Sequence, residues 1–502
     1  MSKFSYTRRD FLKTAGLGAA ALALPGCAGT SRRSPVSEPG ERPNILFCIS
    51  DDQSWLHAGA YADKVVKTPN FDSIAREGVL FNHAYCAAPS CTPSRGGILT
   101  GQHIWRLEQG GNLWSTLPVK FPVYTDLLAQ AGYHVGYTRK GWGPGKVEAG
   151  GRQSNPAGPR YENFTRFLEA APEGAPWCFW FGSTDPHRDY QRGSGVAAGM
   201  RLDEVVVPPV WPDAPEVRSD ICDYYVEIQR FDREVGDMLK LLEQTGQMDN
   251  TLIVITSDNG MPFPRGKANL YDLGTRMPLA IFWKGRIPGG RAVDDFVSHT
   301  DFAPTFLEAA GLKPLGDMTG RSLMVLLTAD RSGRVALERD HVITTRERHA
   351  WVREGGLSYP SRAIRTYDFL YIRNYEPDRW PAGDPPLYGD IDCHDLHYEA
   401  PTKEYIMRYR DDPDVQRLFE LSFGKRPGQE LYDLRSDPHQ LHNVAEEPEY
   451  GEAGLELFAR LETYLKETGD PRATGQEPLW DSYTYYGGKE PHPRENAPIP
   501  KQ

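Results

Sequence analysis

The sequence predicts an α/β fold, in which a mostly parallel β-sheet is covered by helices and followed by a smaller antiparallel α+β domain. From about residue 43 to residue 345, short apolar runs alternate with helical stretches, as in parallel sheets whose strands are joined by helices. Beyond residue 345, short polar turns separate the apolar runs, which is typical of antiparallel hairpins. A length of 502 residues also favours two domains, because single hydrophobic cores stop growing well below this size.

Each element follows from a local pattern. The larger domain is expected to contain five strands, at residues 44–50, 134–138, 177–182, 251–257 and 278–283. A helix should begin at Pro69, because proline suits the first helical position, and should run to about Glu77. A long helix is expected from Ser219 to Thr245. The smaller domain should contain strands at 363–366, 369–373 and 430–434 and a terminal helix at 453–466.

Composition limits the partners and the redox chemistry. A net charge of −11 and a pI near 5.7 argue against nucleic acid as a partner, because a phosphate-binding surface needs a net basic footprint. Local basic pockets for an anionic substrate remain compatible with this charge. Seven cysteines spread over this length do not make a disulfide framework, so the fold is not expected to depend on oxidation.

The amino terminus predicts export. Residues 7–13, which include Arg8 and Arg9, resemble a twin-arginine signal, and an apolar run over 15–25 follows. That run is too short to span a bilayer as a helix. It leads into Leu-Pro-Gly-Cys ending at Cys27, which resembles a bacterial lipobox; a plain secretory peptide or an amphipathic helix is the alternative. We expect an exported protein of the periplasm or cell envelope, anchored by a lipid on Cys27.

A domain organisation follows from these patterns. Residues 28–42 are rich in Ser, Arg, Pro and Gly, which is typical of a flexible tether. The final stretch is rich in Pro, Tyr and charge, and is expected to wrap the surface or to be loosely held. The predicted order is a signal at 1–27, a tether at 28–42, the larger domain at 43–345, the smaller domain at 346–475 and a tail at 476–502.

Polar side chains follow four of the predicted strands. Taken singly, each has an ordinary explanation as a helix cap, a turn or a hydrogen-bonded histidine. Ligands bind outside the carboxyl ends of strands in open α/β sheets, so we expect these groups to converge. Three carboxylates and an amide oxygen suit Ca²⁺ or Mg²⁺ better than Zn²⁺, and we expect Ca²⁺. In chain order the residues are Asp51 and Asp52, Lys140, Asp185-Pro186-His187, and Asp258 with Asn259.

The segment Cys91-Thr92-Pro93-Ser94-Arg95, followed by Gly96-Gly97-Ile98-Leu99-Thr100-Gly101, resembles the signature of type I sulfatases. In that family the cysteine is oxidised to formylglycine, whose hydrate offers one hydroxyl to attack sulfur and a second to help expel the bound sulfate. A buried cysteine in a turn is the structural alternative. The resemblance implies an alkaline-phosphatase-like fold, a sulfated saccharide as substrate, and a formylglycine-generating or sulfatase-maturing enzyme as a partner.

The resemblance also implies a role for each site residue. Asp51, Asp52, Asp258 and Asn259 match the calcium ligands, together with Cys91 as the formylglycine, and Arg95 matches the cation that holds it; Lys140, His187 and Lys267 match the groups that grip sulfate oxygens or protonate the leaving group. One departure concerns the second half-reaction. Many sulfatases have a histidine two residues after the lysine, whereas this chain reads Lys140-Gly141-Trp142-Gly143, so the base for that step is open.

Other stretches resemble the N-sulfoglucosamine sulfohydrolase branch, the heparan N-sulfatases. They lie at residues 185–188, 259–264, 269–271, 358–363 and 430–434, with Asp437-Pro438 after the last. The resemblance implies removal of sulfate from a terminal amino sugar, with a sugar O-sulfatase as the runner-up. A phosphodiester or phosphonate hydrolase of the same superfamily would need an additional histidine where this chain has Asn259-Gly260. A non-catalytic saccharide-binding lipoprotein is the remaining alternative, and it would be expected to have lost a site residue.

The charged run Arg346-Glu347-Arg348-His349 lies near the predicted domain junction. Its charged side chains could bind a sulfated or carboxylated sugar. A solvated charge run is an equally good interpretation.

Overall fold

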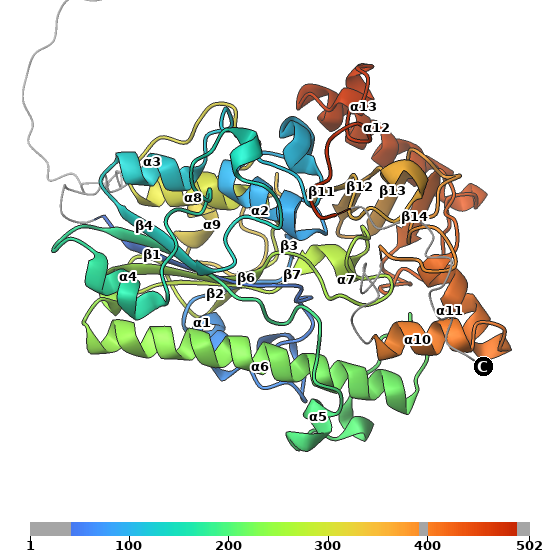
Figure 1. Ribbon diagram of the computed structural model, residues 1–502, viewed down its shortest axis with the longest axis horizontal. Helices are drawn as coiled ribbons and strands as arrows, with labels where there is room; N and C mark the ends of the chain where they lie inside the picture. Colours follow the sequence, from blue (N-terminus) through green and yellow to red (C-terminus); the bar gives the residue numbers. More distant parts are fainter. Residues whose placement is uncertain (1–41, 391–399, 489–502) are drawn as a thin grey trace, which may run out of the picture. The chain divides into compact units, whose positions relative to one another are not determined.

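A computed structural model describes residues 42–390 and 400–488 (Figure 1). Its largest element is a seven-stranded mixed sheet. Strands β4 (134–139), β5 (177–182), β1 (44–50) and β6 (251–257) run parallel, β8 (279–283) is antiparallel to β6, and β2 (79–81) is antiparallel to β8 but parallel to β9 (291–293). All five predicted strands are present, although the fifth, β8, runs against the parallel direction. In spatial order the strands are β4 (His134–Arg139), β5 (Trp177–Gly182), β1 (Asn44–Ser50), β6 (Thr251–Ser257), β8 (Leu279–Trp283), β2 (Val79–Phe81) and β9 (Arg291–Val293).

Helices cover both faces of this sheet (Figure 1). Successive residues of a strand point to opposite faces, so Phe47 of β1 packs on one helix layer and Leu46 on the other. The first layer contains α2 (Cys91–Thr100), α3 (Tyr124–Gln130), α8 (Phe302–Ala309) and α9 (Met324–Leu327). The second layer contains α1 (Pro69–Glu77), α4 (Phe164–Ala170) and α6 (Pro215–Gln244).

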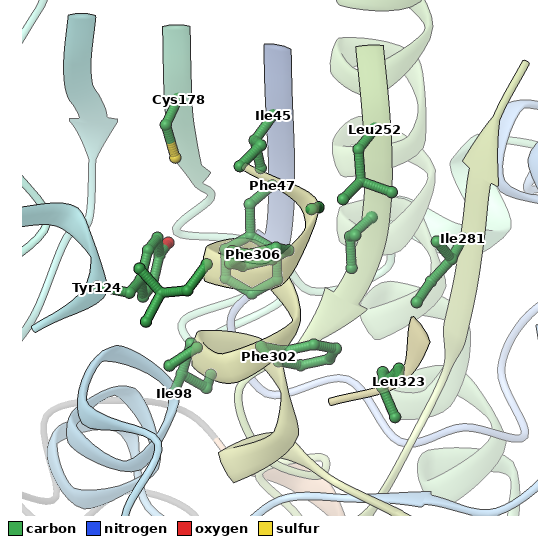
Figure 2. Close-up of a cluster of buried hydrophobic side chains, with 14 of the residues drawn as sticks. Ile45, Phe47, Ile98, Tyr124, Cys178, Leu252, Ile281, Phe302, Phe306 and Leu323 are labelled. Atoms are coloured by element: carbon green, nitrogen blue, oxygen red, sulfur yellow. The ribbon is translucent and has the colours of Figure 1, made fainter. Parts of the chain in front are cut away.

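The core under the first layer is built around aromatic side chains of β1 and α8 (Figure 2). Phe47 is fully buried and lies 4.9 Å from the Trp180 ring in a T-shaped arrangement. Its centroid is 5.4 Å from that of Phe302 and 5.5 Å from that of Phe306. Burying one such side chain contributes about 1.5–3 kcal/mol. This packing fixes β1, the strand that leads into Asp51, against the layer that carries Cys91.

The long predicted helix is α6, and it begins four residues earlier than expected from the sequence. Pro215 occupies its first turn, where the missing amide hydrogen costs nothing. Its buried residues recur at three- and four-residue intervals, including Val217, Ile221, Ile228 and Val235, so one stripe faces the protein. The short helix α5 (Ser194–Ala197) packs against it.

A small three-stranded sheet flanks the main sheet, with β3 (Ala84–Tyr85) between β10 (Val297–Ser298) and β7 (Arg276–Met277). The short helix α7 (Asp272–Thr275) comes just before β7. The Gly260 amide donates to the Gly274 carbonyl at 2.9 Å, which joins the segment after Asn259 to α7.

The carboxyl-terminal part is built on a four-stranded antiparallel sheet. Its strands are β11 (His341–Arg346), β12 (Ser361–Thr366), β13 (Phe369–Asn374) and β14 (Gln429–Asp433). The last three match the predicted strands, whereas β11 was not expected, and through it the antiparallel sheet begins before the predicted boundary at residue 346. The accompanying helices are α10 (Pro401–Arg408), α11 (Pro413–Phe423), α12 (Gly451–Glu467) and α13 (Pro471–Thr474).

Hydrophobic contacts join α12 to one face of this sheet, where Leu457 and Leu461 pack with Ile364 and Tyr371. The five described cysteines are all buried and free. None of the helices in the described part of the chain is both long and apolar enough to cross a bilayer.

Candidate active site

The predicted site residues meet at the carboxyl ends of four adjacent strands. Strands β4, β5, β1 and β6 are parallel neighbours, so the residues that follow them emerge at one edge of the sheet. Asp51 and Asp52 follow β1 directly, Lys140 follows β4, and Asp258 follows β6. A backbone bond from the Asp51 amide to the Asp185 carbonyl, 2.9 Å long, joins the β1 and β5 loops.

Helix α2 brings the cysteine to this edge. Cys91 is its first residue and only 2 % exposed, and the Arg95 guanidinium, one turn later, donates from Nη1 to the carbonyls of Lys140 and Gly141 at 2.8 and 2.9 Å. The Ser94 hydroxyl donates to the Asp258 carbonyl. The amino-terminal end of a helix favours negative charge, so α2 points a favourable dipole at any anion beside Cys91.

Gly182 allows the β4 and β5 loops to approach each other. A Cβ atom at Gly182 would lie 1.7 Å from the Lys140 carbonyl oxygen, so no other residue fits without a shift of the backbone. The same carbonyl accepts a hydrogen bond from the Trp180 indole at 3.1 Å. The position of Lys140 therefore depends on a glycine at the end of β5.

Four potential ligand atoms of Asp51, Asp52, Cys91 and Asp258 lie within 4.8 Å of one another, and all four residues are buried. The Cys91 Sγ is 3.5 Å from Asp51 Oδ1 and 3.9 Å from Asp52 Oδ1. Asp258 Oδ1 accepts from the backbone amides of Asp52 and Asn259 at 3.1 and 2.8 Å. Asp52 adopts a φ of 77°, a left-handed conformation that is uncommon outside glycine and concentrates at functional sites.

The Asn259 amide supports a cation at this cluster. Its Nδ2 donates to Asp52 Oδ1 at 2.7 Å and to the Gly260 carbonyl at 3.0 Å, which directs Oδ1 away from both. Oδ1 is buried and has no hydrogen-bond donor among the described residues. A buried acceptor without a donor is costly, and a hard cation would satisfy it. The donor set of carboxylates and one amide oxygen fits Ca²⁺ or Mg²⁺.

Cations neutralise the carboxylates of this cluster. Burying a charge without a partner is strongly unfavourable, so these pairs are a condition for the cluster to fold. Arg95 also lies 3.6 Å from a second carboxylate, that of Asp51. The pairs are Lys140 Nζ with Asp51 Oδ2 at 2.5 Å, Lys267 Nζ with Asp52 Oδ2 at 2.6 Å, and Arg95 Nε with Asp258 Oδ2 at 2.8 Å.

The same environment sets the protonation of the site. Burial raises the pKa of the Cys91 thiol, so the unmodified side chain is not a thiolate. Burial alone would raise the pKa of Asp51, but Lys140 lowers it to about 2. Burial lowers the pKa of His187, and its Nδ1 lies 2.6 Å from the Arg188 carbonyl. With Nδ1 donating to that carbonyl, Nε2 is free to face the site, 3.8 Å from Asp52 Oδ2.

A cavity of about 590 Å³ opens onto Cys91, Lys140, His187 and Lys267. This volume lies within the range of small-molecule sites. Its wall also includes aromatic residues that sequence reasoning did not single out, namely Trp114, Tyr137 and Trp142. They occur in turns or on a strand without a motif, so only the folded chain reveals them.

In the loop after Lys140, Trp142 stands two residues on, at the position where the resemblance places a second histidine. Between them, Gly141 has no room for a side chain, since a Cβ atom there would lie 2.6 Å from Asn155 Oδ1 and 3.0 Å from the Tyr137 ring. The Asn155 side chain instead holds the loop by accepting from the Trp142 amide at 2.9 Å. Of the described residues that line the cavity, His187 is the one histidine.

The charged run after β11 is buried, which corrects the interpretation as a solvated run. Arg346 donates to Asp390 and to a backbone carbonyl, and Arg348 donates to the Tyr483 carbonyl at 2.7 Å. Neither arginine is among the described residues of the cavity wall, so neither is placed to bind a sugar there. His349 is also buried, and its Nδ1 lies 2.8 Å from the hydroxyl of Ser90, the residue before Cys91.

Comparison with known families assigns the chain. A model described as Sulfatase matches residues 43–154 and 158–312, more than half of the sequence. The chain belongs to the sulfatase family. A second model, N-sulphoglucosamine sulphohydrolase, C-terminal, matches residues 266–380, so the predicted resemblance to that branch is confirmed. A third, for a twin-arginine translocation signal, matches residues 5–25, outside the described residues, and indicates export across the membrane.

Individual sulfatases resemble the chain along most of its length. An ulvan-active sulfatase of Formosa agariphila is 26% identical over 473 residues, covering 86% of this chain and 76% of that protein. Human N-sulphoglucosamine sulphohydrolase is 28% identical over 488 residues, covering 85% of this chain and 91% of that protein. A protein solved in complex with its substrate D-glucosamine-2-N,6-O-disulfate shares the fold, with a TM-score of 0.62 at 20% identity over 87% of this chain and all of that one.

This sulfatase is therefore a sulfuric ester hydrolase with an alkaline-phosphatase-like fold, as its sequence predicted. Acylation of Cys27 lies outside the described residues and stays a prediction, which membrane partition of a Cys27→Ala variant would test.

The buried Asp390 gives a pH-dependent stability prediction. Burial alone would raise the pKa of Asp390, but Arg353 and Arg346 lower it from 3.8 to about 2. A lowered folded-state pKa contributes stability above the unfolded value and loses it as the pH falls through the folded value. We expect Asp390→Asn to lower the free energy of unfolding by about 2 kcal/mol at pH 7, and by clearly less at pH 3, in denaturant titrations.

The matched control is Asp249→Asn, which breaks an exposed pair with Lys284. Its effect should stay within about 0.5 kcal/mol at both pH values. A loss for Asp390→Asn that is equal at pH 7 and pH 3 would show that the ionised carboxylate is not the stabilising group.

Proposed function

We propose that this sulfatase removes sulfate from the terminal sugar of sulfated saccharides, with N-sulfoglucosamine as the first candidate, and that it uses formylglycine derived from Cys91 and one bound Ca²⁺. The observation that carries the proposal is the position of Cys91. It starts a buried helix, within 3.5–3.9 Å of two carboxylates, in the same cavity as Lys140, His187 and Lys267.

Each residue can then be given a task. Formylglycine at position 91 would supply one hydroxyl to attack sulfur and a second to expel the sulfate. Asp51, Asp52, Asp258 and Asn259 would hold the cation, which polarises the sulfate and lowers the pKa of the attacking hydroxyl. His187, with Nδ1 donating to the Arg188 carbonyl, would accept at Nε2 the proton that the attacking hydroxyl loses and pass it to the leaving nitrogen or oxygen as its bond to sulfur breaks.

Charge balance supports this arrangement. Three carboxylates and three cations cancel among the described site residues, so a divalent cation leaves two positive charges. A bound sulfate monoester supplies one negative charge, and loss of a proton from the attacking hydroxyl supplies the other. Lys140 and Lys267 would then neutralise charge that develops on the sulfate oxygens.

His187 would also serve the second half-reaction. Trp142 stands where the resemblance places a second histidine, and His187 is the one histidine among the described cavity residues. Having given its proton to the leaving group, the neutral imidazole can accept the proton of the second hydroxyl as the aldehyde re-forms and the C–O bond to sulfate breaks.

The match to the carboxyl-terminal model of N-sulphoglucosamine sulphohydrolase and the 28% identity to the human enzyme favour an N-sulfated sugar. A sugar O-sulfatase is the second candidate, favoured by the similarity to an N-acetylglucosamine-6-O-sulfatase of Bacteroides thetaiotaomicron, 24% identical over 90% of this chain and 90% of that protein. A phosphonate or phosphodiester hydrolase would need a histidine ligand near Asp258, where this chain has Asn259-Gly260. A non-catalytic saccharide-binding protein is disfavoured, because all the matched site residues are retained and those of the acidic cluster around Cys91 are buried together.

The first prediction concerns Cys91. In protein made together with a maturing enzyme, peptide mass spectrometry should find an aldehyde at this position. Cys91→Ala should lower turnover by about 10⁴-fold or more, because the nucleophile is lost, while the melting temperature changes little. Cys222→Ala, at a buried cysteine of α6, is the matched control and should keep full activity. Full activity of Cys91→Ala would end the proposal.

The second prediction concerns the metal. Elemental analysis of the pure protein should return about one equivalent of calcium or magnesium, and chelation should abolish activity that added Ca²⁺ restores. Asp258→Ala should lower metal content and reduce turnover by about 100-fold or more. The exposed Asp249→Ala variant should change neither. Stoichiometric zinc without calcium would contradict the assignment, since zinc prefers nitrogen and sulfur ligands.

The third prediction concerns the substrate. Sulfate release should be measured on N-sulfated, 6-O-sulfated and 2-O-sulfated glucosamine under one set of conditions. A pocket that pairs particular polar groups rejects analogues strongly, so the N-sulfated sugar should be preferred by about 100-fold or more. Rapid sulfate release from an O-sulfated sugar, with none from the N-sulfated one, would contradict the preference for N-sulfoglucosamine and support a sugar O-sulfatase.

A further inference from the structure

Trp114 differs from the other aromatic residues of the cavity wall in its backbone and its exposure. Its φ of 51° lies in the left-handed region, which bulky side chains rarely adopt. Its neighbours Asn112, Leu113 and Ser115 are buried, whereas Trp114 is partly exposed. Strained backbone of this kind persists only where the surroundings enforce it, and it concentrates at functional sites.

Two segments hold the turn that carries Trp114. On one side, the Leu113 amide donates to the Arg348 carbonyl at 3.0 Å, and the Arg348 amide donates to the Asn112 side chain at 3.1 Å. On the other side, the Lys146 amide donates to the Ser115 carbonyl at 2.8 Å. The buried Arg348 thus supports the cavity wall through its backbone.

A third segment, residues 480–488, crosses this turn from the carboxyl-terminal end of the described chain; we call it the C-terminal strap. The Asn112 side chain donates to the Trp480 carbonyl at 2.9 Å, and the Tyr486 amide donates to the Trp114 carbonyl at 2.8 Å. Gly487 packs directly on the indole, because a Cβ atom there would lie 2.5–2.8 Å from three atoms of the Trp114 ring. The strap therefore fixes both the backbone and the ring of Trp114.

Among the described residues of the cavity wall, the other aromatic rings are buried and the two arginines are paired. Tyr137 and Trp142 are buried to 9 % and 4 % exposure, so Trp114 offers the more accessible ring. The guanidinium of Arg139 is paired with Glu234, and that of Arg188 is paired with Asp220 at 2.8 Å. Outside the groups around Cys91, the described wall therefore offers a ligand the aromatic surface of Trp114, because its two arginines are already paired with carboxylates.

We propose that Trp114 stacks on the C–H face of the pyranose ring that bears the sulfate, and that the C-terminal strap positions it there. The proposal rests on the proposed sulfatase function and adds the residue that recognises the sugar. An indole held rigidly gives a large contact area at low entropic cost, which suits one apolar ring face. Sulfate contacts and sugar contacts would then come from separate parts of the cavity.

The test compares two substrates, a sulfated monosaccharide and a sugar-free alkyl sulfate. Trp114→Ala should lower kcat/KM for the saccharide by about 10- to 100-fold, mainly through KM, because ring stacking is lost. Trp114→Phe should keep kcat/KM within about 5-fold, because a ring remains. Turnover of the alkyl sulfate should stay within about 2-fold in both variants. An equal loss on both substrates, or no loss on either, overturns the proposal.

The strap is tested by Gly487→Ala, which introduces a methyl group against the indole. It should reproduce the selective loss on the saccharide. Gly451→Ala is the matched control, because a Cβ atom there meets no atom within 4 Å. Equal saccharide kinetics for these two variants would overturn the positioning role of the strap.

Binding separates this proposal from the sulfatase proposal. Calorimetry of the metal-loaded Cys91→Ala protein with the sulfated monosaccharide should show binding that Trp114→Ala weakens by about 10-fold or more. Binding that depends on Trp114, in an enzyme that hydrolyses no sulfated sugar, would sustain the sugar platform and overturn the function. Hydrolysis and binding that are both independent of Trp114 would sustain the sulfatase function and overturn the sugar platform. Absence of both hydrolysis and binding would overturn both proposals.

Discussion

The rest of the structure depends on the pairing of three buried carboxylates with three cations at the carboxyl edge of the sheet. Removing such charges from water costs several kcal/mol per ion, so each needs a close partner of opposite sign. The partners come from α2 and from the loops after β4 and β6, three segments far apart in sequence. The parallel order of the strands, the aromatic packing of β1 on α8 and the close approach at Gly182 are the means by which these segments meet.

Much of the fold and most of the site could be predicted from the sequence. Strands buried on both faces read as continuous apolar runs, and the polar residues that end them mark the ligand edge. The short strands β2 and β9, three residues each, carry too little pattern to be recognised, and nothing local indicates that β8 reverses direction. Trp114 could not be found either, since its role depends on residues near Trp480, which is 368 positions away from Asn112.

The run from Arg346 to His349 shows why composition alone misleads. Consecutive charges usually indicate a solvated segment. Here the Arg346 guanidinium meets the Asp390 carboxylate and that of Arg348 meets backbone carbonyls, so at least one terminal nitrogen of each planar group reaches an acceptor. The charges therefore tie the segment that follows β11 to Asp390 and to the C-terminal strap.

The burial of Cys91 has a consequence for the order of events during synthesis. In the folded chain the Cys91 thiol is 2 % exposed and faces a cavity of about 590 Å³, which can admit a small molecule but not the active site of another enzyme. In the proposed mechanism Cys91 becomes formylglycine, so its oxidation and the folding of the chain would compete in time, and the oxidation would have to come first. A chain that folds too quickly would be stable and correctly assembled, yet permanently inactive. Slow pairing of distant strands, which a sheet of this topology entails, lengthens the interval in which the cysteine can be reached.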